Sequence, residues 1–147
     1  MNSRELRQFI RNNPSLQKFK FGGVIAKNHL PAKSEGKFFI INTQNCTQPG
    51  NHWTAIWTDT KHRVCEYFDP IGQDAQPDVK LKLFEYGGGE YVYNRKRIQR
   101  QGSILCGQFC LFFLYHKSKN KSMKHILNLF KNKNADSVVK TFYLKMK

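Results

Sequence analysis

The sequence predicts an α+β fold in which a small, mostly antiparallel sheet packs against a central buried helix, with further helices flanking it. Two observations carry this prediction. Short apolar runs that end at turn residues indicate strands before residue 70. The run from Cys106 to Lys117 is apolar on nearly every side, which is typical of a buried helix. At 147 residues, the chain is expected to form a single domain, residues 1–147, with a hydrophobic core.

The N-terminal region predicts a helix and a strand separated by a turn. Residues 3–12 are expected to form a helix that Ser3 caps. Its apolar residues share one face: Leu6, Phe9 and Ile10. The pair Gly22–Gly23 predicts a turn, and residues 37–41 predict a strand before a polar loop, residues 42–51.

The middle of the chain predicts a hairpin. Residues 52–58 and 63–68 read as its two strands, and the first of them alternates so that Trp53, Ala55 and Trp57 share a face. The second strand ends in the turn Asp69–Gly72. A helix over 78–85 and a short strand over 91–94 follow.

The C-terminal third predicts three helices. The buried helix 106–117 comes first, and Ser122 caps the second. The third begins at Asn134 or Asp136 and turns an apolar face inward.

Composition narrows the class of protein. Hydrophobic residues make up 39% and aromatic residues 14%, which favours a packed fold over disorder. No apolar stretch approaches membrane-spanning length, and the first residues lack a signal-peptide core. We therefore expect a soluble monomer that is not secreted and has no membrane partner.

The chain is strongly basic, with 25 Lys and Arg residues against 10 acidic ones, a net charge of +15. Such a surface attracts polyanions, so non-specific DNA binding is one interpretation. A solvated lysine-rich surface is the other. Lysine outnumbers arginine, which argues against sequence-specific base contacts.

The four cysteines, Cys46, Cys65, Cys106 and Cys110, contain no CxxC pair and do not predict a disulfide framework. Without other clues, Cys106 and Cys110 could both be buried core residues. A zinc site from Cys46, His52, Cys65 and Cys106 is a further alternative, but the preferred interpretation has no metal.

Cys106 stands where a polar loop meets the buried helix, so the helix dipole favours its thiolate. His52 opens a strand and could exchange a proton with that thiol. Asp69 ends the paired strand and could hold the imidazole in place, although an Asp-Pro turn would explain it too. The order His, Asp, Gln, Cys thus describes a cysteine-nucleophile site.

The loop before Cys106 supplies candidates for the remaining roles. Gln99 could donate its amide to a developing oxyanion together with the Cys106 backbone N–H, and Gln101 competes for this role. Gly102 and Ser103 keep the approach to the nucleophile open for substrate.

Three stretches of the sequence resemble the adenovirus-protease (adenain) family of cysteine peptidases, in the same clan as the SUMO and ubiquitin-like proteases. They are Gly50-Asn-His52-Trp53, Val64-Cys-Glu-Tyr-Phe-Asp69-Pro-Ile-Gly72 and Gln99-Arg-Gln-Gly-Ser-Ile-Leu-Cys106-Gly-Gln-Phe-Cys110. The resemblance implies His52 as base, Asp69 as third member, Gln99 as oxyanion donor and Cys106 as nucleophile. It also implies cleavage after glycine in a narrow tunnel that Trp53 clamps.

The resemblance further implies a compact maturation protease of a small DNA virus or virophage. It would process capsid or core precursors in the virion and the infected cell, without a required cofactor but with stimulation by DNA or a peptide. Two alternatives stand beside it: an isopeptidase acting on a ubiquitin-like modifier, and a basic nucleic-acid-binding protein with an inactive peptidase core.

Overall fold

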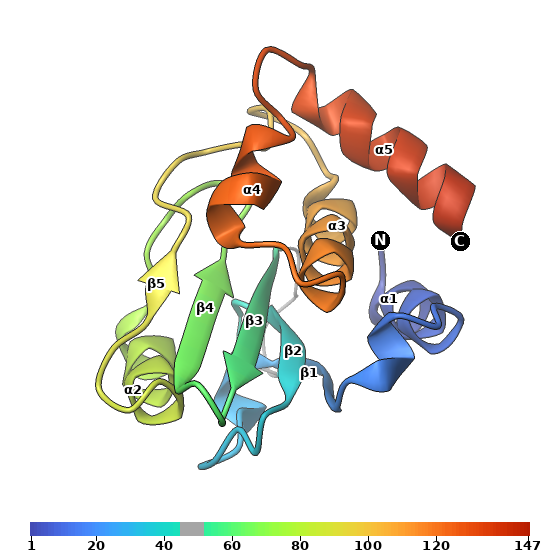
Figure 1. The fold of residues 1–147 in the computed structure, drawn as a ribbon. Coiled ribbons are helices and arrows are strands. Elements are labelled where there is room, and N and C mark those ends of the chain that lie inside the picture. Colours follow the sequence, from blue (N-terminus) through green and yellow to red (C-terminus); the bar gives the residue numbers. More distant parts are fainter. Residues whose placement is uncertain (45–51) are drawn as a thin grey trace.

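The fold comes from a computed structural model that describes residues 1–44 and 52–147 (Figure 1). Cys46 and most of the loop expected over 42–51 lie outside the described residues. The elements follow in this order: α1 (Ser3–Arg11), η1 (Leu16–Lys18), β1 (Phe21–Ala26), η2 (Lys27–His29), β2 (Phe38–Asn42), β3 (Trp53–Asp59), β4 (Val64–Phe68), α2 (Pro77–Tyr86), β5 (Val92–Tyr93), α3 (Cys106–Ser118), α4 (Met123–Asn128) and α5 (Ala135–Met146).

The described strands form one sheet in the order β1-β2-β3-β4-β5. The β3–β4 hairpin is confirmed, with Ala55 opposite Phe68, and β2 also pairs antiparallel with β3. Both edge strands pair in parallel, β1 with β2 and β5 with β4. The sheet is therefore mixed, with an antiparallel centre.

The predicted turn at Gly22–Gly23 is wrong, because β1 runs through both residues. The register shifts between Phe21 and Gly23, which is a bulge in the strand. A Cβ at Gly22 would lie only 2.0 Å from Cε1 of Phe39, and Gly23 has a φ of +121°. The glycines thus permit a close approach and a bulge, not a reversal of the chain.

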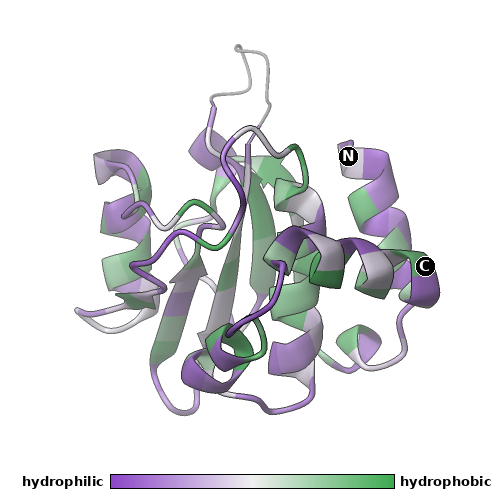
Figure 2. Cartoon of the chain, turned by 90° about the horizontal axis from the view of Figure 1, so that it is seen from above, coloured by the Kyte–Doolittle hydropathy of each residue, from purple (hydrophilic) through white to green (hydrophobic). Residues whose placement is uncertain are grey.

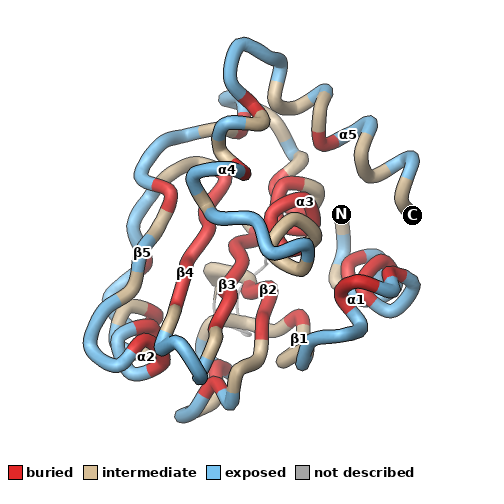
Figure 3. The backbone as a smooth tube through the Cα atoms, viewed as in Figure 1, coloured by how far each residue is buried: buried red, intermediate tan, exposed pale blue. Residues whose placement is uncertain are grey.

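Two hydrophobic clusters cover the two faces of the sheet. The predicted face of β3 (Trp53, Ala55 and Trp57) packs with α1, α3 and the C-terminal helices. The other face, with Ile56 and Tyr67, packs against α2. Figure 3 shows burial concentrated in β3, β4 and α3, and Figure 2 shows hydrophilic residues on the outer parts of the flanking helices. The central position of α3 is confirmed, since its residues from Phe109 to Leu114 are buried.

Side-chain caps fix where the helices begin. The expectation for α1 was wrong by one residue: Asn2, not Ser3, is the cap, and its Oδ1 accepts the backbone N–H of Glu5 at 2.9 Å. Glu5 accepts the Asn2 N–H in return, so the two form a capping box. The cap at Ser122 is confirmed, and Asn134 is the residue that caps α5.

None of the helices in the described residues combines the length and apolarity that a membrane crossing requires.

Candidate active site

Cys106 is the first residue of α3, at the end that meets the loop from β5 (Figure 1). Its side chain is 5% exposed. No side chain caps this helix end, so its backbone N–H groups remain available. The backbone N–H of Gly107 in this helix and that of Trp53 at the start of β3 hydrogen bond to the sulfur. The fold therefore places the thiol where a negative charge is stabilised.

His52 and Asp69 meet because they flank paired strands. His52 immediately precedes β3 and Asp69 immediately follows β4, and these ends of an antiparallel pair lie together. His52 Nε2 lies 2.8 Å from Asp69 Oδ1. The His52 side chain also hydrogen bonds to Cys106, and Nδ1 is the ring nitrogen left for that contact. The structure thus brings the three predicted residues into one chain of contacts.

The electrostatics of these three residues favour an ion pair between Cys106 and His52. Burial lowers the pKa of His52, but hydrogen bonds and charge from Asp69 and Cys106 outweigh it and raise that pKa from 6.5 to about 9. Burial raises the pKa of Cys106, yet the contacts with His52 and with two backbone N–H groups bring it below its usual value. These opposed shifts favour a thiolate facing an imidazolium over the neutral pair.

The other described cysteines have the opposite character. Burial raises the pKa of Cys65 to about 12 and that of Cys110 well above its usual value. Cys65 also packs in the cluster on the opposite face of the sheet from Cys106. In the described residues, no group of three or more His, Cys, Asp or Glu side chains is placed to share a metal ion. The fourth residue of the zinc alternative, Cys46, lies outside them.

Asp69 is held by a residue that the sequence did not indicate. Asn94 is 4% exposed, accepts the Asp69 backbone N–H at 2.9 Å and donates to the Asp69 carbonyl at 2.7 Å. The Asp69 carboxylate also accepts the N–H of Ile71 at 3.0 Å, so it is both turn former and partner of His52. An isolated Asn after a short strand gives no sequence signal for this role, because its partners are backbone groups 25 residues away.

Of the two candidate glutamines, Gln99 is buried and Gln101 is exposed. Gln99 Nε2 donates to the Ser103 carbonyl at 2.7 Å, while its buried Oε1 has no partner within the described residues. Gly102 is exposed with a φ of +82° and open space around it. Ser103 Oγ accepts the N–H of Leu105 at 3.1 Å and so shapes the approach to α3.

Trp53, the residue expected to clamp the substrate, is almost fully buried. It is 8% exposed, and its indole N–H donates to the carbonyl of Met1 at 3.0 Å. Met1 also lies against the start of α3, since a Cβ at Gly107 would come within 3.0 Å of its sulfur. The residues around Met1 thus cover Trp53 beside the nucleophile.

Several known proteases are similar to this chain in sequence. No protein-family model matches the chain. Over 106 residues it is 33% identical to the protease of bovine adenovirus 7, covering 63% of this chain and 50% of that one. The chain is thus similar in sequence to adenovirus proteases over about half of their length. The protease of human adenovirus B serotype 3 is 27% identical over 109 residues, covering 65% of this chain and 49% of that one.

Solved structures agree at the level of the fold. The ASFV pS273R protease matches in two crystal structures, at TM-scores of 0.52 and 0.50 with 24% and 20% identity. The matches cover 74% and 75% of this chain, and 43% and 42% of those chains. The chain thus shares its α+β fold with these structures. It spans about half the length of the curated relatives it matches.

Proposed function

We propose that the protein is a thiol endopeptidase that cleaves after glycine in capsid or core precursors during virion maturation. The observation that carries this proposal is the contact chain Asp69–His52–Cys106, with its 2.8 Å carboxylate–imidazole bond and its opposed pKa shifts. The relatives named as proteases support it. An assembled triad also argues against a purely DNA-binding protein with a degenerate core.

In the acylation half of the reaction, the Cys106 thiolate attacks the carbonyl carbon of the scissile bond. One N–H of the Gln99 amide is bonded to the Ser103 carbonyl, so its second N–H and the Cys106 backbone N–H donate to the oxyanion of the tetrahedral intermediate. The C–N bond then breaks, and the imidazolium of His52 gives its proton to the leaving amine. Asp69 keeps the ring oriented and stabilises its charged form. The products are a free amine and a thioester on Cys106.

In the deacylation half, neutral His52 takes a proton from water, whose oxygen attacks the thioester carbonyl. The second tetrahedral intermediate collapses, the C–S bond breaks, and the carboxylic acid leaves. This restores the thiolate–imidazolium pair. No step requires a metal or an organic cofactor, and stimulation by DNA or a peptide would act on how the site is ordered.

Glycine selection rests on the enclosure around Trp53. A peptide that passes beside Trp53 to reach the sulfur finds little room for side chains, which favours residues without a Cβ. Gly102 and Ser103 line the approach on the other side of this path in the proposed mode of binding.

The test is to incubate the protein with the co-encoded structural proteins and to map new termini by mass spectrometry. We expect new C-termini at glycine, with none formed by Cys106→Ala. If the structural proteins remain intact, while ubiquitin or SUMO suicide probes label Cys106, the target is a ubiquitin-like modifier and the maturation role is wrong.

A further inference from the structure

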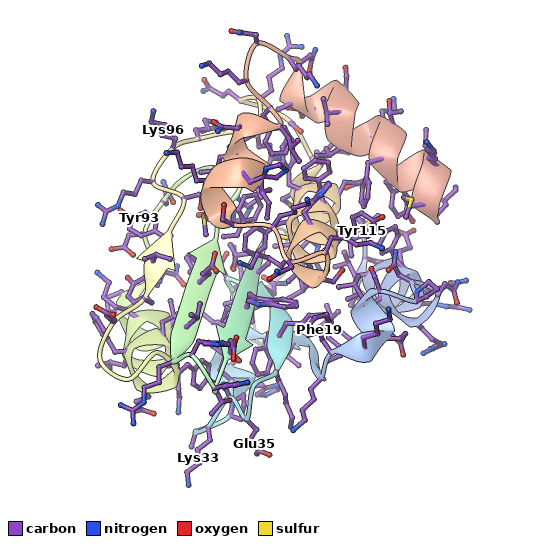
Figure 4. The ribbon with its side chains drawn as sticks, in the orientation of Figure 1. Phe19, Lys33, Glu35, Tyr93, Lys96 and Tyr115 are labelled. Atoms are coloured by element: carbon purple, nitrogen blue, oxygen red, sulfur yellow. The ribbon has the colours of Figure 1, made fainter. Side chains whose placement is uncertain are left out.

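A basic groove lies beside the candidate active site. Its volume is about 1120 Å³. One side is lined by residues 94–98 and Arg100, in the segment that leads from β5 towards α3. The other is lined by residues between 123 and 136, in α4, the segment after it and the start of α5. Figure 1 shows α4 beside that segment, and Figure 4 shows Lys96 on its outer side. The groove is of a size that holds several peptide side chains.

Both walls carry positive charge. The side chains that matter are Arg95, Lys96, Arg100, Lys124, Lys131 and Lys133. None of them forms an ion pair with another described residue. Asp136 is the acidic residue among the described lining, and its carboxylate already accepts the Arg100 backbone N–H at 2.8 Å. The groove therefore presents an excess of uncompensated positive charge.

The floor of the groove is aliphatic. Ile98, Met123 and Leu127 line it and are only partly buried against the core. Phe130 is the aromatic residue in the described lining, but it is 7% exposed and its ring packs on those of Phe109 and Phe112. Single-stranded nucleic acids need exposed aromatic faces on which bases stack. This floor suits leucine-like side chains better than bases.

We propose that the groove binds an acidic peptide segment of the substrate, with aliphatic side chains on the floor and carboxylates paired with the walls. A smaller pocket shares Arg100, Asn134 and Asp136 with the groove and continues along residues 101–105 to the start of α3. A bound segment is thereby directed towards Cys106. The assignment to substrate rests on the proposed endopeptidase function, whereas the affinity for an acidic peptide does not.

The groove also contacts the catalytic residues indirectly. Asn94 lines it and holds the Asp69 backbone on both sides. Asn94 Nδ2 further donates to the Lys96 carbonyl at 3.1 Å, which links Asp69 to a wall residue. An occupied groove therefore fixes the segment that positions the partner of His52.

The experiment measures binding to the Cys106→Ala protein, so its result does not depend on catalysis. The probe is a short fluorescein-labelled peptide of Asp and Glu around two Leu residues, followed by fluorescence anisotropy. The test variant is Lys124→Glu/Lys131→Glu. The matched control, Lys33→Glu/Lys61→Glu, makes the same charge change at the other end of the molecule, where Figure 4 shows Lys33.

We expect the test variant to bind the probe at least about tenfold more weakly and the control to bind it normally. Leu127→Ser in the protein should also weaken binding of the probe. A probe with Ser in place of both Leu residues should bind poorly to the wild-type groove and to every variant. In the active protein, adding the acidic segment to a glycine-containing substrate should lower KM in the wild type and not in Lys124→Glu/Lys131→Glu.

Three results would overturn the proposal. One is an equal loss of binding in test and control variants, which would indicate bulk charge alone. Another is no measurable binding of the probe. The third is a single-stranded oligonucleotide that binds more tightly than the peptide and displaces it, which would assign the groove to nucleic acid.

Discussion

Replacing Asp69 by Asn tests how the Cys106–His52 pair is held in its charged form. The rise in the pKa of His52 from 6.5 to about 9 corresponds to about 3 kcal/mol in favour of the imidazolium, at about 1.4 kcal/mol per pH unit. Asp69 and Cys106 both raise the pKa of His52, and burial of the ring lowers it. If Asp69 supplies about half, the pKa of His52 should fall by about one unit in Asp69→Asn.

The assay is the pH dependence of kcat/KM on a fluorogenic glycine peptide. The charged pair forms as pH rises through the lowered pKa of Cys106 and is lost as pH rises through that of His52. The alkaline limb should therefore lie near 9 in the wild type and at least about one unit lower in Asp69→Asn. An Asn cannot stabilise the imidazolium, so kcat/KM should fall by up to about 10⁴-fold, the size of the effect of the same change in a Ser-His-Asp triad.

The matched control is Asp59→Asn. Asp59 makes a similar contact, 2.7 Å to His62, but on the exposed surface, so its replacement should leave the pH profile unchanged. Asp69→Asn should keep its melting temperature, because Asn retains the acceptor for Ile71 and the backbone pair with Asn94. An alkaline limb that stays near 9, or a loss below about tenfold, would refute the reasoning.

Three further outcomes are expected. Iodoacetamide at neutral pH should modify Cys106 ahead of Cys65 and Cys110 in the native protein, as read by peptide mass mapping; equal rates would contradict the pKa assignments. Lys117→Met should lower the free energy of unfolding by about 3–5 kcal/mol in denaturant melts, because it leaves the buried Glu66 carboxylate, 2.6 Å from the Lys117 ammonium, without its partner. Adding Glu66→Gln to this variant should recover part of the lost stability. Asn94→Ala should lower kcat and move the alkaline limb down; a loss of stability with an unmoved limb would make its role merely structural.

The residues of the candidate site could be read from the sequence because their chemistry depends on residue type and local position. Cys106 stands at a junction between polar and apolar residues, and His52 and Asp69 bracket a hairpin that alternation predicts. Hairpin pairing alone brings the last two together, since neighbouring strands need no long-range information.

What the sequence did not reveal depends on distant contacts. Gly22 and Gly23 have the composition of a turn, and only the ring of Phe39 from the next strand explains why they lie in a bulged one. The parallel pairing of the edge strands likewise depends on crossover connections, residues 27–37 and 69–91, whose course no local pattern encodes. Asn94 acts through backbone partners, which no residue pattern encodes.

The cap of α1 shows a smaller limit of the same kind. Asn2 and Ser3 are both good capping residues, and the choice depends on which of them keeps an extended backbone just before the first helical residue. The capping box with Glu5 decides for Asn2, and the preceding residue, Met1, then meets Trp53.

Hydrolysis of a glycine-scanning peptide library by the wild type and by Cys106→Ala tests the central claim most directly. The account predicts cleavage on the carboxyl side of glycine by the wild type and none by Cys106→Ala, with both proteins folded to the same extent by circular dichroism. Cleavage that persists in Cys106→Ala, or that is as fast after bulky residues as after glycine, would contradict it.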